Sequence, residues 1–196
     1  MSTSKDLFLA ILSMDAYNRG YGAGISDAGD NDPDGLGEAG SQIGGATVLD
    51  VDLPAGSPAA GFYAVAYEQP TYGTIISYRG TDDDPDYLKG WLIGAGLGST
   101  WTQADEALDF YEAVTEQNYW EGPAQNTIVI GHSLGGGLAG LVSSLTGTEG
   151  YGFDHMPFGI AAIGFAGTDD VDNPVLSQCH ACRLGVRMPH NDRWMV

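Results

Sequence analysis

The sequence predicts an α/β fold in which a mostly parallel sheet has helices on both faces. Two kinds of segment alternate along the chain: short runs rich in Val, Ile and Thr, and longer segments with apolar residues at helical spacing. Strands that alternate with helices pair in parallel through crossover connections, so this alternation predicts the architecture. The sequence has no internal repeat and no linker, and we expect one domain over residues 1–196.

The expected elements follow in chain order. The first helix spans residues 4–17, because Leu7, Ile11 and Met14 lie at helical spacing after a Ser or Thr cap. Residues 20–45 are rich in Gly and Asp and predict a long surface loop. Strands are expected at residues 46–53, 61–67, 73–79, 127–131, 160–166 and 182–188, and further helices at residues 102–117 and 134–145.

The protein is strongly acidic, with 26 Asp and Glu against 7 Lys and Arg and a formal net charge of −19. Such a surface repels phosphate backbones and anionic lipids, which argues against nucleic acid and anionic membranes as partners. No apolar run reaches the length of about 18 residues that a membrane span needs, so we expect no stable membrane insertion. The N-terminal segment makes a poor signal peptide, which leaves a cytoplasmic location and export by another route both open.

The most informative segment is residues 127–140, Thr-Ile-Val-Ile-Gly-His-Ser-Leu-Gly-Gly-Gly-Leu-Ala-Gly. It predicts a strand, a sharp turn with a Gly-x-Ser-x-Gly pattern, and a helix that begins at once. Ester hydrolysis needs a hydroxyl that projects beside N–H groups able to stabilise an oxyanion, and such a turn supplies both. The five-residue pattern is weak evidence in a chain with 30 Gly, and its strand-turn-helix context gives it weight. We therefore expect Ser133 to be the nucleophile and the N–H of Leu134 to lie in the oxyanion hole.

A second motif, Tyr-Arg-Gly-Thr-Asp at residues 78–82, ends the expected strand 73–79. Together with Gly-His-Ser-Leu-Gly-Gly it makes the chain resemble the lipase class 3 family of α/β-hydrolases. In that family an aromatic-Arg-Gly-Thr/Ser strand end and an acidic-aromatic segment, at residues 86–91 in this chain, precede the serine elbow. The resemblance covers roughly residues 70–170 and implies an α/β-hydrolase fold, with Thr81 beside Leu134 in the oxyanion hole. The residues alone agree, because a strand that runs into Gly and a small hydroxyl residue lays N–H donors beside the elbow.

The acid and the base are harder to place. Ser133 needs a His that is oriented by a carboxylate, in the chain order Ser, acid, His. Asp192 lies just past the expected strand 182–188 and matches the family's acid in a comparable Asn-Asp context. No His follows Asp192, and His190 on the same segment precedes it. This departs from the family pattern.

Three alternatives are open for the base. In the first, which we favour slightly, the chain is a C-terminally truncated form whose base lay beyond Val196. In the second, Asp169 or Asp170 is the acid and His190 or His180 is the base of a compressed triad. In the third, a fragment keeps the elbow but has little activity.

Two other histidines are expected outside the catalytic set. His132 lies within the elbow and points away from the reactive face of Ser133 by backbone alternation, and His155 is expected to be a loop or lid residue. The apolar segment 91–101, bounded by tryptophans, predicts a lid or an acyl-pocket wall, with a buried element as the alternative.

Two patterns point to other kinds of function. Asp30–Gly35 repeats the opening half of an EF-hand loop, but its twelfth position is Ser41 instead of Glu, which favours a solvated acidic turn over calcium binding. Cys179 and Cys182 form a Cys-His-Ala-Cys sequence without a second ligand cluster, and we interpret them as incidental thiols. No metal site is predicted.

The sequence thus predicts a serine carboxylic-ester hydrolase, an esterase or lipase, that forms an acyl-Ser133 intermediate and needs no cofactor. Apolar residues and the scarcity of cationic groups near the motifs favour uncharged small-molecule or lipid esters over phosphorylated ones. The alternatives are a catalytically impaired fragment or a non-catalytic module that binds an apolar ligand, and a calcium-dependent or redox protein. The oligomeric state and the acyl chain length are left open.

Overall fold

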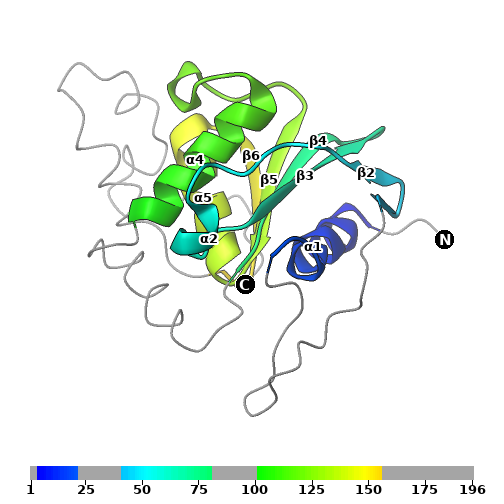
Figure 1. Ribbon diagram of the computed structural model, residues 1–196. Coiled ribbons are helices and arrows are strands. Elements are labelled where there is room, and N and C mark those ends of the chain that lie inside the picture. Colours follow the sequence, from blue (N-terminus) through cyan, green and yellow to red (C-terminus); the bar gives the residue numbers. More distant parts are fainter. Residues whose placement is uncertain (1–3, 22–40, 81–100, 156–196) are drawn as a thin grey trace, which may run out of the picture.

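A six-stranded sheet with helices on both faces forms the described part of the computed structural model, which covers residues 4–21, 41–80 and 101–155 (Figure 1). The strands follow chain order across the sheet: β1 (Gln42–Ile43), β2 (Ala46–Val48), β3 (Ala64–Gln69), β4 (Gly73–Tyr78), β5 (Thr127–His132) and β6 (Glu149–Phe153). The helices are α1 (Lys5–Asp15), α2 (Ser57–Ala60), α4 (Trp101–Thr115) and α5 (Leu134–Thr146), with 3-10 turns η1 (Ala16–Asn18) and η2 (Tyr119–Glu121).

The sheet is mixed, whereas the sequence predicts a mostly parallel one. Strands β1 to β4 pair antiparallel in succession, and β5 pairs in parallel with both β4 and β6. The difference follows from the connections. Residues 70–72 join β3 to β4, and so short a link permits only antiparallel pairing. Helices α4 and α5 lie in the two connections that flank β5, as crossovers between parallel strands require. The α/β class and the helices on both faces are confirmed, and among the described strands the parallel pairs are those of β4, β5 and β6.

Helix bounds agree with the sequence analysis to within two residues at each end, and Ser4 caps α1 by accepting a hydrogen bond from the N–H of Leu7 at 3.3 Å. Strand β6 was missed, because its Glu-Gly-Tyr-Gly-Phe sequence has too few branched residues to predict a strand. The strands expected at 160–166 and 182–188 lie outside the described residues. None of the helices within the described ranges has the length and apolar character that crossing a bilayer demands.

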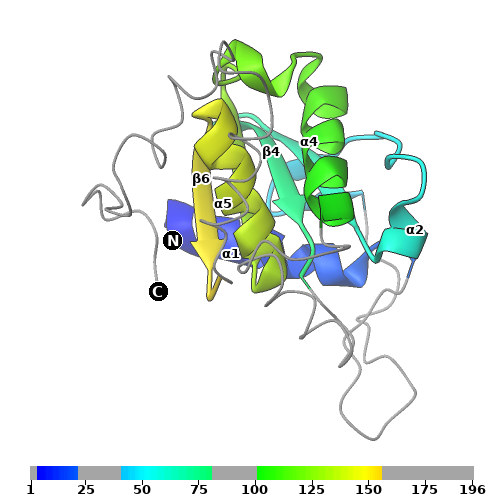
Figure 2. The ribbon, with the colours of Figure 1, turned by 90° about the vertical axis from the view of Figure 1, so that its left-hand side faces the viewer.

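Each face of the sheet has its own apolar core. Side chains of β5 alternate between the two cores: Ile128 and Ile130 pack on the side of α1, and Val129 packs on the side of α4 and α5. Figure 1 shows α1 on one face and α4 and α5 on the other, and Figure 2 shows α5 beside β6. The same alternation assigns Gly131 to the α5 face and His132 to the α1 face.

Candidate active site

Ser133 is the single residue between β5 and α5. Its φ of 54° and ψ of −122° are strained for a residue with a side chain. The N–H of Ser133 donates to the carbonyl of Phe153 at 3.0 Å, and its own carbonyl accepts from the N–H of Gly137 at 3.1 Å. The turn is therefore held by β6 on one side and by the first turn of α5 on the other. The half-buried Ser133 keeps access to solvent.

Two glycines allow the close approach that makes this turn. A Cβ on Gly131 would lie 2.2 Å from the carbonyl carbon of Gly135, so the strand and the helix contact each other through bare backbone. A Cβ on Gly135 would lie 2.0 Å from the carbonyl oxygen of Tyr78, at the end of the neighbouring strand. Both distances are far shorter than a real Cβ contact. The elbow therefore requires Gly at both positions and is pressed against the end of β4.

The N-terminus of α5 lies at the carboxyl end of β5, next to Ser133. Leu134 is the first residue of the helix, and its side chain is buried in the core between α4 and α5. The first N–H groups of a helix have no intrahelical partner and carry the positive end of its dipole. The side chain of Ser133 does not cap these groups. The backbone N–H of Leu134, which the sequence predicts to lie in the oxyanion hole, is the first of these groups.

The end of β4 approaches the elbow from the other side. Tyr78 pairs with Gly131 in the parallel register, and then the N–H of Arg79 turns to the carbonyl of Tyr63 at 2.9 Å. A Cβ on the buried Gly80 would lie 2.6 Å from the carbonyl oxygen of His132, so these two backbones are also in close contact. Thr81, the proposed second donor of the oxyanion hole, is the next residue and lies outside the described ranges.

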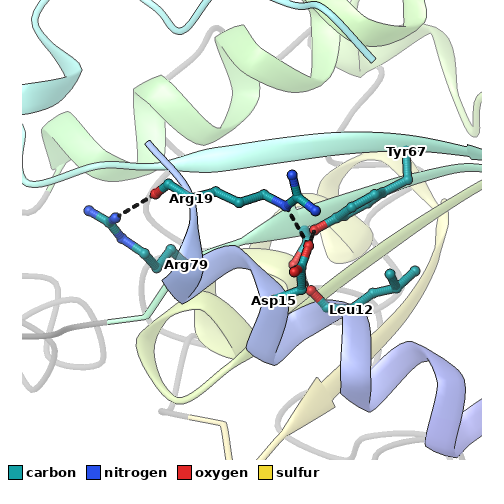
Figure 3. Close-up of polar contacts among 6 residues, drawn as sticks. Leu12, Asp15, Arg19, Tyr67 and Arg79 are labelled. Carbon is teal, nitrogen blue, oxygen red and sulfur yellow. Dashed lines mark hydrogen bonds and ion pairs between the residues drawn. The ribbon is translucent and has the colours of Figure 1, made fainter. Parts of the chain in front are cut away.

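Arg79 of the Tyr-Arg-Gly-Thr motif anchors the end of β4. Its buried guanidinium lies over the rings of Tyr63 and Tyr21, at 4.7 and 5.1 Å from the ring centroids. Its Nη1 donates to the carbonyl of Tyr21 at 2.7 Å. The same nitrogen donates to the carbonyl of Arg19 at 3.3 Å (Figure 3). These contacts tie the strand end to the segment that follows α1.

That segment is fixed in turn by a buried ion pair. Arg19 pairs with Asp15 at the end of α1, and the hydroxyl of Tyr67 on β3 donates to the same carboxylate at 2.7 Å (Figure 3). Burial raises the pKa of Tyr67, with the charge of Asp15 acting in the same direction, so the phenol stays protonated and remains a donor. The sequence analysis did not include residues 15–21 in the site, because nothing local to them signals contact with β4.

His132 lies on the α1 face of the sheet, opposite to α5. Its Nδ1 is 3.1 Å from the hydroxyl oxygen of Tyr17 in η1, and the two rings meet edge to face at 5.9 Å. Burial lowers the pKa of His132, and the nearby charge of Asp154 opposes that shift. The imidazole is therefore neutral near pH 7, and its Nδ1 contacts the hydroxyl of Tyr17.

His155 follows β6 by two residues and packs beside the elbow. Its Cβ would lie 2.7 Å from a Cβ on Gly136, in the first turn of α5, and 2.9 Å from a Cβ on Gly152 in β6. His155 is in a loop, as the sequence analysis expects, but this loop lies against the nucleophile helix. The paired small residues Gly136 and Gly152 are the sequence signal that could have indicated this contact.

Several predicted site residues lie outside the described ranges. These are Thr81, the acid Asp192, the base His190, and the alternatives Asp169, Asp170 and His180. The Asp30–Gly35 loop and the pair Cys179 and Cys182 lie outside them too. Within the residues that the structure describes, no group of three or more His, Cys, Asp or Glu side chains could hold a metal ion.

The fold and the elbow define the class of protein: an α/β protein whose strained serine stands between a parallel strand and a helix. Residues 8–156 match the model of the Tle-like phospholipase domain. The chain belongs to this phospholipase-like family, since the match spans well over half of its length. The membership supports a lipase-like hydrolase of ester lipids without singling out the class 3 lipases. No curated protein matches the chain.

Proposed function

We propose that the protein is a serine carboxylic-ester hydrolase of lipid esters, with Ser133 as its nucleophile. The observation that carries this proposal is the strained backbone of Ser133 at the start of α5. A non-glycine residue keeps such angles only when its surroundings enforce them, and strain of this kind gathers at active sites. A sharp strand-to-helix turn with Ser at its apex is typical of the nucleophile elbow of α/β-hydrolases.

The proposed reaction follows acyl transfer through Ser133. The Oγ attacks the ester carbonyl and gives its proton to a histidine, while the carbonyl oxygen becomes an oxyanion. The N–H groups of Leu134 and Thr81 stabilise that charge. The intermediate then breaks the bond to the alcohol, which takes the proton from the histidine. Water attacks the acyl-serine by the same route, releases the fatty acid and restores the serine.

The finer family identity is part of the proposal. Order and content of the two motifs, Tyr-Arg-Gly-Thr at the end of β4 and Gly-His-Ser-Leu-Gly after β5, support the likeness to class 3 lipases. The parallel β4–β5–β6 unit with α4 and α5 in its connections supports the α/β-hydrolase fold. In such folds the catalytic groups lie at the carboxyl ends of the parallel strands, where Gly80 follows β4 and Ser133 follows β5.

For the acid and the base we retain Asp192 and His190 as proposals. Both lie beyond residues 8–156, the part of the chain that matches the family model. Within that part, His155 is the histidine that packs beside the first turn of α5. Replacing His155, His180 and His190 by Gln, one at a time, tests which of them, if any, is the base. A variant that loses the base falls by orders of magnitude in kcat, and the others keep most of their activity.

The family and the charge together narrow the substrate. Phospholipase-like membership supports phospholipids as substrates, in addition to the uncharged esters that the sequence favours. The carboxylic ester is the bond that the proposed Ser133 reaction would cleave in them. A net charge of −19 disfavours approach to anionic surfaces, so we propose a zwitterionic phospholipid over an anionic one. Release of fatty acid from phosphatidylcholine and phosphatidylglycerol micelles, compared at low salt, tests this preference.

The direct test of the function is hydrolysis of a short chromogenic ester and of phosphatidylcholine micelles. We expect Ser133→Ala to lower kcat by about 10⁴-fold or more, as loss of a serine nucleophile does in other hydrolases. Ser144→Ala is the matched control, because Ser144 lies on the same helix and donates to the carbonyl of Gly140 at 2.7 Å, away from the elbow. A wild-type protein that turns over no ester contradicts the proposal and favours the non-catalytic, ligand-binding alternative.

A further inference from the structure

Tyr17 lies where the two backbone segments of the proposed oxyanion hole meet. It belongs to η1, only 3% of its surface is exposed, and its hydroxyl oxygen is 3.1 Å from His132 Nδ1 and 3.4 Å from the carbonyl oxygen of His132. A Cβ on Gly80 would lie 2.1 Å from the same hydroxyl oxygen. One hydroxyl thus contacts the residue before Thr81 and the residue before Ser133.

The proposed catalysis depends on how these two segments are placed relative to each other. Each donor of an oxyanion hole must lie at hydrogen-bond distance from the oxygen as its charge develops. A misplacement of about 1 Å in an active site can lower the rate by about 10²-fold. Gly80 follows β4, Thr81 is the next residue in the sequence, and Leu134 begins α5, so the separation of the two proposed donor segments depends on what holds Gly80 against His132.

We propose that Tyr17 is a positioning residue that sets this separation and so aligns the oxyanion hole. The inference rests on the proposed function. With His132 neutral and its proton on Nε2, the Tyr17 hydroxyl donates to Nδ1 and its oxygen fills the space above the Cα of Gly80. Tyr17 acts on the oxyanion hole through its contacts with His132 and Gly80 and is not a catalytic residue.

A second contact from the same segment supports this assignment. The carbonyls of Arg19 and Tyr21 accept hydrogen bonds from the guanidinium of Arg79, one residue before Gly80. Figure 3 shows the guanidinium of Arg79 beside the carbonyl oxygen of Arg19. The chain after α1 therefore holds the end of β4 at two successive residues, and at Tyr17 it also holds the elbow.

The substitution Tyr17→Phe tests the proposal, because it removes the hydroxyl and leaves the edge-to-face ring packing on His132. We expect kcat to fall by about tenfold or more with KM changed by less than about twofold, since the donors act on the transition state. The inhibition constant of an alkyl boronic acid, which forms a tetrahedral adduct on Ser133, should rise by a similar factor. All rate constants are referred to active sites titrated with a fluorophosphonate.

Tyr111→Phe is the matched control for the loss of a buried tyrosine hydroxyl. Tyr111 lies on α4, and its hydroxyl contacts Thr148 Oγ1 at 2.7 Å and the N–H of Ala124 at 3.1 Å, two residues that precede β6 and β5 at the opposite ends of these strands from Ser133. This variant should be less stable than wild type at unchanged kcat. An effect of Tyr17→Phe that came from stability alone would appear in Tyr111→Phe as well.

Variants at His132 separate positioning from a merely structural role. His132→Asn keeps an acceptor near the place of Nδ1 and should retain more activity than His132→Ala. The double variant Tyr17→Phe/His132→Ala should be no slower than the slower single variant, because both remove the same link. An unchanged kcat and boronic acid inhibition in Tyr17→Phe overturns this inference alone. Absence of ester turnover in the wild-type protein overturns the proposed function and this inference with it.

Discussion

Strands β4 and β5 are parallel neighbours that end side by side, and their ends are held in different ways. The end of β5 is held by close backbone contacts: the lack of a Cβ at Gly131 lets the strand touch the start of α5, and the lack of one at Gly135 lets α5 touch the end of β4. The end of β4 is also held by residues about sixty positions earlier, through Arg79, Tyr17 and the buried pair of Asp15 and Arg19. The nucleophile is thus placed by backbone contacts, and its proposed oxyanion partner by side-chain contacts with a distant segment.

This difference separates two kinds of robustness. Steric exclusion of a Cβ allows no gradual adjustment, because the atoms in conflict are backbone atoms. Polar anchoring is a set of individual interactions, each of which can be removed at a limited cost. Substitutions of the elbow glycines should therefore disrupt the fold and the site completely. Each substitution along residues 15–21 should instead lower stability by a limited amount.

The largest effect is expected at the elbow. Gly135→Ala places a Cβ 2.0 Å from the carbonyl oxygen of Tyr78, so we expect a loss of about 3 kcal/mol or more in the free energy of unfolding, and no ester hydrolysis. Gly147→Ala is the control: its φ is 76° and the nearest atom would lie 3.7 Å away, which costs about 1 kcal/mol. Urea unfolding measures both. Equal losses in the two variants would contradict the steric account.

The buried ion pair should come next. Asp15→Asn removes the carboxylate charge that pairs with the buried Arg19, and we expect a loss of about 3 kcal/mol. Glu149→Gln breaks the ion pair between Glu149 and Lys5. Because the side chain of Lys5 is 31% exposed and that of Glu149 is 35% exposed, this change should cost less than about 1 kcal/mol. Unfolding of both variants at one pH and salt concentration checks the contrast. A larger loss in Glu149→Gln would show that the buried pair does not anchor the strand end.

A smaller stability effect is expected from Arg79→Lys. Lysine keeps the charge but loses the planar group that lies over two tyrosine rings and binds two carbonyls, so we expect a loss of about 2 kcal/mol. Because Gly80 follows directly, kcat should fall as well, with Ser133 still labelled by a fluorophosphonate. If the variant is less stable but hydrolyses esters at an unchanged rate, then the contacts of Arg79 support the fold without positioning the site.

The smallest effect is the contribution of His132 to the pH dependence of stability. Its imidazole faces Tyr17 of η1 and the charge of Asp154 after β6, and burial lowers its pKa in the folded protein. As pH falls through the ordinary histidine pKa of about 6.5, the unfolded chain takes up a proton that the folded protein does not. The free energy of unfolding should therefore decrease on acidification over that range. His132→Asn should reduce this slope, which urea unfolding between about pH 5.5 and pH 7.5 measures. A slope unchanged by the substitution would contradict the expected shift.

The same contrast explains what the sequence could predict. The elbow could be predicted because strand, turn and helix are contiguous, and the contact that requires Gly131 is with Gly135, a near neighbour in the sequence. The role of Arg79 could not, because its partners Arg19, Tyr21 and Tyr63 come from other parts of the chain. The mixed sheet was missed for a related reason, since the alternation of strands and helices begins only after β4. Thr81, Asp192 and His190 stay predictions.

The most direct test of the central claim is covalent labelling of the folded protein with a fluorophosphonate, read by intact mass and peptide mapping. The account predicts a single adduct, located on Ser133, and no adduct on Ser133→Ala. Folded wild-type protein that stays unlabelled, or a label that persists in Ser133→Ala, would contradict it.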